Sequence, residues 1–316
     1  MEKNRIKKIS FNILKILVTT LLFVLIFDKV DINSTIMMLK TIAPSFFIIA
    51  LLVMIVEVLI ANFRWKIVLK QLGSNITFYK ALRYLWIGVF FNQALPSSIG
   101  GDAVRGYYLC KNENYSLSDA TIGVLLDRVM GLLGLVLLVI LTIPLIFEST
   151  ITVLTKWTIL SIIFFALLAI ILSLIIDLIP NKFSQLKIIN GLVKFSTKGR
   201  EVLFSYYGLI AVILSIIIHL TFVFAAWLLA YGMGLDIPFI GMLLIVPITN
   251  LLIALPISIA GWGIREGLFI TGLGYLNVSS DAALALSILY GLLMLVVSLP
   301  GFVDWFIQKP KIPREI

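Results

Sequence analysis

The chain has little of what most catalytic and redox sites require. Its 316 residues include one cysteine, Cys110, and one histidine, His219. A single cysteine excludes an internal disulfide and a cysteine-based metal site, so it leaves the redox compartment open. The nucleotide-binding loop G-x-x-x-x-G-K is absent, which excludes a pump driven by that loop. His219 lies in an apolar run, and we interpret it as a hydrogen-bonded side chain rather than a proton relay.

Charge is scarce as well. Charged residues make up 13% of the chain and apolar residues 61%, and the mean hydropathy is +1.11. These values lie far outside the range of soluble proteins and indicate a polytopic membrane protein. The longest polar segment, 177–207, is too short for a soluble domain, so we expect residues 1–316 to form a single transmembrane domain. A helix needs roughly 20 apolar residues to cross the membrane, and six runs qualify: 10–27, 42–61, 118–147, 157–176, 209–231 and 282–303.

The charges that are present are mostly basic and lie in the connections between apolar runs. Lysine and arginine number 25, against 16 acidic residues. Cytoplasmic connections of membrane proteins are enriched in these cations, and such clusters attract anionic lipid rather than nucleic acid. We therefore predict a multi-pass protein of the cell membrane with both termini in the cytoplasm and anionic lipid at that face. The four clusters lie at 3–8, 64–83, 177–208 and 309–314.

Two polar interruptions stand out in the rest of the apolar sequence. The run 84–95 ends in NQALPSSIGGDAVRG, residues 92–106. The run 239–255 ends in NLLIALPISIAGWGIREG, residues 250–267. Proline, paired glycines and charged residues are costly inside a membrane span, so each interruption marks a place where the helix breaks.

The basic clusters decide how these interrupted segments are arranged. Full crossings at both places would force the 177–208 cluster to the outer side, against the positive-inside tendency. If both segments turn back at mid-depth, all four clusters stay inside. We therefore predict two re-entrant hairpins, at about 84–112 and 239–277, that enter the membrane from opposite sides.

The two interruptions also match each other. Residues 94–105 and 254–265 align without gaps, and seven of the twelve positions are identical. Corresponding interruptions in two halves of opposite orientation point to a transporter's binding site near the bilayer midplane. We expect an inverted repeat with halves 10–156 and 157–305. The predicted fold class is an all-α polytopic membrane protein with six full spans plus two oppositely oriented re-entrant broken-helix hairpins.

Proline and glycine explain how each hairpin turns. Proline disfavours the α conformation in the residue before it, so Pro96 and Pro256 are predicted hinges that end the first helix of each hairpin. Glycines in the turns permit backbone angles that bulky residues resist. Unpaired backbone at membrane depth is tolerated only beside protein or a wet cavity, so the tips should line a cavity. The second helix of each hairpin would direct its N–H groups and positive dipole end toward the membrane centre.

Arg105 and Arg265 occupy matching places, about one turn inside these second helices, and add two permanent positive charges. They predict one anion-binding site between the facing tips. Asp102 could cap its helix or pair with Arg105, and Glu266 could balance Arg265. A purely structural role for both arginines stays open, and no metal or cofactor is predicted. The candidate substrate-binding residues are Ser97, Ser98, Gly100, Gly101, Asp102, Arg105, Ser258, Gly261, Gly263, Arg265 and Glu266.

Further charges lie inside other predicted spans. Asp127 and Arg128 are about ten residues into the 118–147 run, where charge is costly unless it is paired. We expect them to form a second layer beneath the first hairpin, either functional or as a structural ion pair. Glu57 and Arg64 share a helical face, two turns apart, and Arg64 is predicted to snorkel to the interface. The predicted interfacial anchors are Trp65 and Trp157.

In this order, the motifs resemble the transmembrane region of the lysylphosphatidylglycerol synthases and related stand-alone flippase-like proteins. The resemblance covers roughly residues 10–305 and rests on NFRWKIVLKQLG, NQALPSSIGGDAVRGYYL, LLDRVMG and ALPISIAGWGIREG. It implies translocation of lipid between leaflets, with the broken helices forming the headgroup cavity. The synthases carry a large soluble domain after this region, and the chain stops at Ile316, so we do not expect synthase activity. The resemblance draws attention to Pro96, Gly100, Gly101, Asp102, Arg105, Asp127, Arg128, Pro256, Gly261, Gly263, Arg265 and Glu266.

The sequence thus leads to a lipid flippase or transporter for an anionic or lipid-linked substrate. One alternative is an integral-membrane transferase or phosphatase acting on a lipid phosphate, with Glu266 or Asp102 as a lone base. Against it, no aspartate cluster is spaced for a divalent metal, and no serine or cysteine stands beside a base. Another alternative is a membrane anchor subunit for a separately encoded enzyme. The expected partners are a membrane lipid as substrate and either a second copy of the chain or a partner enzyme.

Overall fold

The computed structural model is entirely helical over the part of the chain that it describes. That part comprises residues 17, 20–21, 24–26, 30–95, 100–113, 115–144, 152–178, 187–254, 258 and 260–307. The helices are α2 (Ile32–Lys40), α3 (Pro44–Gln71), α4 (Phe78–Ala94), α5 (Gly100–Glu113), α6 (Leu117–Leu141), α8 (Val153–Ile175), the 3-10 turn η1 (Ile176–Leu178), α9 (Lys187–Leu203), α10 (Tyr206–Gly232), α11 (Phe239–Ile253), α12 (Ile264–Gly274) and α13 (Ser280–Ile307).

Five helices of the described region are long and apolar enough to cross a membrane: α3, α6, α8, α10 and α13. They coincide with five of the six predicted spans, with shifted ends. Helix α3 continues to Gln71, and α6 stops at Leu141. Most of the sixth predicted span, 10–27, lies outside the described residues, as do the chain termini whose cytoplasmic location was predicted.

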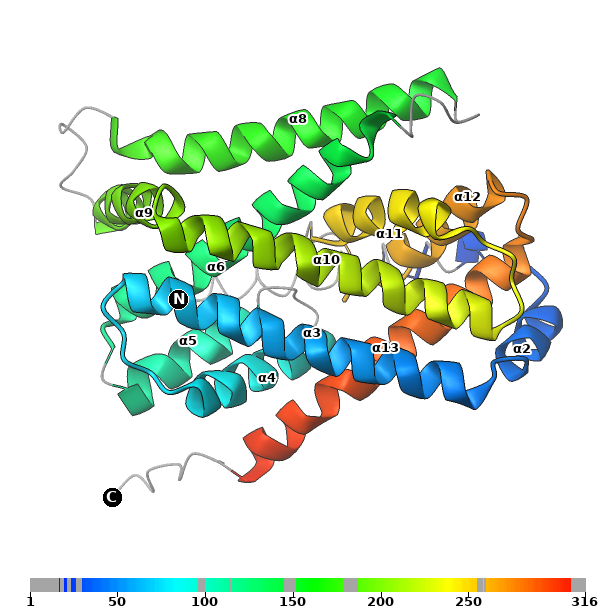
Figure 1. The fold of residues 1–316 in the computed structure, drawn as a ribbon, viewed down its shortest axis with the longest axis horizontal. Coiled ribbons are helices and arrows are strands. Elements are labelled where there is room, and N and C mark those ends of the chain that lie inside the picture. The colour runs from blue at the N-terminus through cyan, green and yellow to red at the C-terminus, as the bar shows by residue number, and fades with distance from the viewer. Residues whose placement is uncertain are drawn as a thin grey trace.

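The long helices pack tightly because small residues lie at their crossings. Helices α3 and α10 lie side by side over most of their length, and α6 crosses α10 (Figure 1). Gly134 of α6 faces Ser215 of α10 so closely that a side chain at Gly134 would meet the backbone of Ile216 at 3.0 Å. Close approach of this kind is the usual source of helix association in membranes, where hydrophobic burial contributes little.

Two shorter helix pairs lie between the long helices. Helix α4 packs against α5, and α11 packs against α12, each pair being joined at a tip. Figure 1 shows the two pairs in opposite halves of the long axis, with their open ends at opposite ends of the molecule. The first pair begins at Phe78 rather than at residue 84, because Thr77 caps the helix through the backbone N–H of Lys80. Leu95, which precedes Pro96, leaves the helix with ψ 146°, as the proline predicts.

The two tips differ in local structure although their sequences match. Residues 100–103 already belong to α5, whereas residues 260–263 form a turn with positive φ at Ala260, Gly261 and Gly263. Helix α12 therefore begins only at Ile264. As a result Arg105 lies in the second turn of its helix and Arg265 in the first, so the prediction that each lies about one turn inside its helix was wrong for Arg265. Gly263 supplies the left-handed angle of 85° that Ala103, its counterpart, would resist.

Candidate functional site

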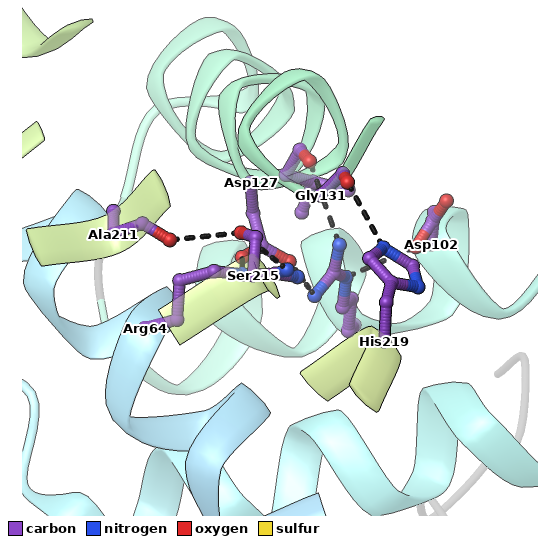
Figure 2. Close-up of polar contacts among 9 residues, drawn as sticks. Arg64, Asp102, Asp127, Gly131, Ala211, Ser215 and His219 are labelled. Atoms are coloured by element: carbon purple, nitrogen blue, oxygen red, sulfur yellow. Dashed lines mark hydrogen bonds and ion pairs between the residues drawn. The ribbon is translucent and has the colours of Figure 1, made fainter. Parts of the chain in front are cut away.

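A buried network of charges surrounds the tip of the first helix pair (Figure 2). Asp127 of α6 lies at its centre and is 2% exposed. Its Oδ1 accepts a hydrogen bond of 2.9 Å from Nε of Arg64, and its Oδ2 accepts one of 2.9 Å from Nη1 of Arg105. One carboxylate thus joins α3, α5 and α6. We define the first tip cluster as Arg64, Asp102, Arg105, Asp127 and Arg128.

The second carboxylate of this cluster is Asp102, in the first turn of α5. It lies 3.1 Å from Nε of Arg105, which confirms the predicted pair, and its Oδ2 accepts a 2.5 Å bond from Nε of Arg128. Three guanidinium groups therefore share two carboxylates, and these five side chains carry one net positive charge. Arg105 is 3% exposed, whereas 47% of the Arg128 side chain is exposed. Arg128 thus forms the accessible edge of the cluster.

Arg64 and Trp65, which were predicted to lie at the membrane interface, are instead buried in or against the cluster. Arg64 is buried and also donates to Oγ of Ser215 on α10 at 3.0 Å, so the prediction that it snorkels to the interface was wrong. Trp65 is fully buried, with its ring 4.9 Å from the Arg105 guanidinium, and is no interfacial anchor. The bond of 3.1 Å between Nε2 of His219 and the carbonyl of Gly131 confirms the interpretation of His219. Trp157 is exposed, as an anchor would be.

One backbone N–H in the first turn of α5 is bonded within the protein. The N–H of Gly101 donates to Oδ1 of Asn92 on α4 at 3.0 Å. Glycine is required at position 101 because a Cβ there would collide with the Asn92 side chain and with the backbone of Gly88. The N–H of Gly101 is therefore not available to an anion at this helix end.

The second tip carries a smaller and neutral cluster. Arg265 donates to Oε1 of Glu266 from Nη2 at 2.6 Å, and to Oγ of Ser287 on α13 from Nε at 3.2 Å. Glu266 is fully buried, and its Oε2 accepts the N–H of Gly263 at 2.5 Å. The Trp262 ring lies 4.4 Å from the guanidinium. We define the second tip cluster as Arg265, Glu266 and Ser287.

The two clusters remain separate. Within the described part of the chain, no hydrogen bond or ion pair links a residue of the first tip cluster to one of the second. Glu266 neutralises Arg265, as predicted, whereas the first tip cluster keeps a surplus charge. Each arginine is bound by acidic side chains of its own tip cluster, and the shared anion-binding site between the facing tips stays a prediction.

Several predicted site residues fall on the tips themselves. Ser258 is buried, and its hydroxyl has no hydrogen-bond partner among the described residues. Gly100 begins α5 against the side chain of Leu95, and Gly261 adopts its positive φ beside Ile253. The predicted hinges Pro96 and Pro256, and the predicted substrate residues Ser97 and Ser98, lie outside the described residues.

Two serines of the clusters were missed at the level of sequence. Ser215 and Ser287 lie in the middle of long apolar helices and are fully buried. Polar side chains are costly at that depth unless they are bonded, so their position could have drawn attention to them. Their arginine partners are 151 and 22 residues away along the chain, and no spacing rule connects such pairs. The described residues contain no group of three or more histidine, cysteine or acidic side chains that could hold a metal.

An apolar pocket of about 190 Å³ lies beside the second helix pair. It is enclosed by α8, α11 and α12 and extends from Tyr275 at the open end of the pair to Leu252 and Leu268 near its tip. The hydroxyls of Thr155 and Tyr275, 3.4 Å apart, lie at the open end. Its walls are otherwise built mainly from aliphatic side chains, so it suits a hydrocarbon chain.

Comparison with known proteins agrees with this architecture. UPF0104 membrane protein MJ1595 of Methanocaldococcus jannaschii is 25% identical over 98% of each chain. UPF0104 membrane protein MJ1078 of the same organism is 27% identical over 72% of this chain and 97% of its own. UPF0104 membrane protein PH1989 of Pyrococcus horikoshii is 30% identical over 35% of this chain and 33% of its own. Residues 12–301 match the family described as the lysylphosphatidylglycerol synthase TM region, and the chain is a membrane protein that belongs to this family.

Proposed function

We propose that the protein moves an anionic or lipid-linked substrate between the leaflets of the cell membrane. The observation that carries this proposal is the first tip cluster, where three arginines share two carboxylates inside a membrane protein. Surplus positive charge at such depth is costly unless an anion or water offsets it. A phosphate or carboxylate headgroup that enters beside Arg128 would supply the missing negative charge and accept charge-assisted hydrogen bonds.

The two helix pairs fit this proposal as oppositely oriented re-entrant hairpins. In that arrangement a lipid headgroup passes the tips at mid-depth, while its acyl chains stay in the bilayer or enter the apolar pocket beside α8. The outward side of α8 presents large apolar side chains such as Leu154, Phe164 and Phe165, as expected of a surface in contact with lipid. We assign Arg265 and Glu266 to holding α12 against α13, because their charges cancel.

The basic helix α9 fits a cytoplasmic surface in contact with anionic lipid. Lys194 and Lys198 are half-exposed there and pair with Asp119 and Glu201 at the surface. Such exposed pairs contribute little to stability, so both lysines can exchange partners for lipid phosphates. This location agrees with cytoplasmic termini and with the four basic clusters of the sequence.

The proposal is tested by leaflet exchange of labelled lipids in vesicles that contain the purified protein. Phosphatidylglycerol with a fluorescent acyl chain is placed in both leaflets, and an impermeant quencher reports the fraction that reaches the outer one. We expect faster exchange than in empty vesicles, and faster exchange of the anionic probe than of phosphatidylcholine. Equal rates with and without the protein for every probe would contradict lipid transport and favour an enzyme or an anchoring subunit.

The matched variants are Arg128→Gln and Glu201→Gln. Arg128→Gln removes the surplus charge at the accessible edge, and loss of one charge-assisted contact should slow exchange by roughly 10- to 100-fold. Glu201→Gln changes an exposed carboxylate on α9, far along the chain from the tips, and should leave exchange unchanged. Folded yield of both variants is measured first, so that a loss of exchange is assigned to the site.

A further inference from the structure

Neither cluster accounts for Glu57, a carboxylate in the middle of α3. Glu57 is 8% exposed and lies midway along the 28 residues of that membrane-spanning helix. Ionisable side chains at this depth are rare and costly, and those that occur are usually paired or line a path for a substrate or an ion. Its burial therefore requires a compensating group or a neutral state.

Among the residues that the structure describes, no such group contacts Glu57. Its side chain forms no hydrogen bond and no ion pair with any described residue, whereas the other buried carboxylates, Asp102, Asp127 and Glu266, each bind an arginine. The nearest cation on the same helix is Arg64, two turns away or about 10 Å along the axis. Arg64 directs its donors to Asp127 and Ser215 instead.

Glu57 interacts electrostatically with groups on two helices. On α3 the charge of Arg64 acts on Glu57, and on α13 Glu57 acts on the buried Tyr290 hydroxyl. On other helices that pack against α3, titratable side chains are hydrogen-bonded to other partners. Asp127 on α6 binds Arg64, His219 on α10 binds Gly131, and Tyr84 on α4 binds Glu113.

We propose that Glu57 is a proton-binding site that couples lipid transport to the proton gradient. This rests on the proposed transport function. Glu57 takes a proton from one aqueous side and releases it to the other, while the tip clusters stay bonded by their own ion pairs. When it is ionised, its charge acts on Arg64 of the first tip cluster and on the Tyr290 hydroxyl of α13.

A proton fits this site better than a metal cation. Cations such as Ca²⁺ and Mg²⁺ require several oxygen ligands, and the described residues contain no group of three or more histidine, cysteine or acidic side chains that could hold a metal. A proton needs a single oxygen.

The experiment has two readouts on the whole protein in phosphatidylglycerol vesicles. Infrared difference spectra recorded across a pH series detect a protonated carboxyl group directly, without any transport. Labelled-lipid distribution under an imposed pH gradient, at equal sodium concentrations, reports coupling. One proton per lipid shifts the leaflet ratio by about tenfold for each pH unit. The variants are Glu57→Gln and Glu57→Asp, with Glu201→Gln as the exposed-carboxylate control.

We expect a titrating carboxyl band in the wild type and in Glu201→Gln, displaced in Glu57→Asp and absent in Glu57→Gln. We also expect Glu57→Gln to lose the response to the pH gradient. A Glu57→Gln protein that keeps the band overturns the proton site, and one that keeps the gradient response overturns the coupling. A response to a sodium gradient at constant pH overturns the choice of ion. If the wild type moves no lipid, transport fails, and the infrared band alone decides whether Glu57 binds a proton.

Discussion

The tips of the two helix pairs hold the same arginine in different surroundings. Arg105 shares Asp102 and Asp127 with two further arginines from α3 and α6, and the five side chains carry a net charge of +1. Arg265 binds the adjacent Glu266 and a serine of α13, and its charge is cancelled. The first arrangement leaves a charge for a ligand to complete, whereas the second is complete in itself.

The difference arises from where the carboxylates lie relative to each arginine. Asp102 precedes Arg105 by one helical turn, and its counterpart in the second tip is Trp262, which stacks on Arg265 instead. Glu266 follows Arg265 directly, and its counterpart in the first tip is Gly106. Arg105 therefore needs Asp127 from another helix, and this requirement brings Arg64 into the same cluster. Matched substitutions in the first and in the second tip cluster test this distinction.

The largest expected effect is the loss of a central carboxylate. Asp127→Ala leaves Arg64 and Arg105 buried without their shared acceptor, and we expect the free energy of unfolding to fall by about 5 kcal/mol. Glu266→Ala removes the carboxylate partner of Arg265, which keeps its hydrogen bond to Ser287. It should lower the free energy of unfolding by about 3 kcal/mol. Unfolding by denaturing detergent in mixed micelles measures both. Equal losses would contradict the view that Asp127 serves two arginines.

Double variants that remove both charges of an ion pair test which of the two arginines is needed for lipid exchange. Asp102→Asn with Arg105→Gln should slow phosphatidylglycerol exchange at least about tenfold, because the Arg105 fork is lost from the proposed site. Arg265→Gln with Glu266→Gln removes a balanced pair and should leave the exchange rate within about threefold. Exchange in vesicles is compared at equal folded yield. The reverse order of effects would move the headgroup site to the second tip.

Replacing the stacked rings should have a smaller effect. Trp65→Phe weakens the contact with the Arg105 guanidinium and leaves a small void, and we expect a loss of about 1–2 kcal/mol in the free energy of unfolding. Trp262→Phe at the second tip should cost less, because Trp262 is only half-buried. The same unfolding assay ranks the pair, and a greater cost for Trp262→Phe would indicate that the second tip is the more tightly packed.

The smallest expected effect lies outside both tips and serves as a reference. Hydrogen bonds from Arg200 and then from Ser196 hold the pKa of the partly buried Asp177 carboxyl below its ordinary value. A lowered pKa stabilises the folded state fully above the unfolded pKa of about 4, and the stabilisation is lost as the pH falls through the folded pKa. Asp177→Asn should lower the unfolding temperature slightly at pH 7. The two proteins should converge in acid, and a difference that persists there would exclude this cause.

The long helices and the ion pairs between neighbouring residues at the tips were predicted from the sequence. Five of the six spans predicted from hydrophobic runs are found as long apolar helices, because a membrane-crossing helix leaves a length signal that few other structures share. The proline rule located the end of α4 at Leu95, and the spacing of Asp102 and Arg105 predicted their contact. These features depend on residues within one or two turns of each other. The re-entrant hairpins, the repeat and the lipid substrate stay predictions.

Only the tertiary structure decided which side chains pair with each buried charged group. The sequence by itself determined a membrane protein with two broken helices and an arginine at each break. It assigned Arg64 to the interface and Trp65 to an anchor, because a cation and an indole near the end of a predicted span commonly have those roles. The structure buries both beside Arg105, since α3 is longer than its apolar run and packs against α6. A charged side chain at that depth is stable only when it is bonded to suitable partners, and those partners come from helices far apart in the chain.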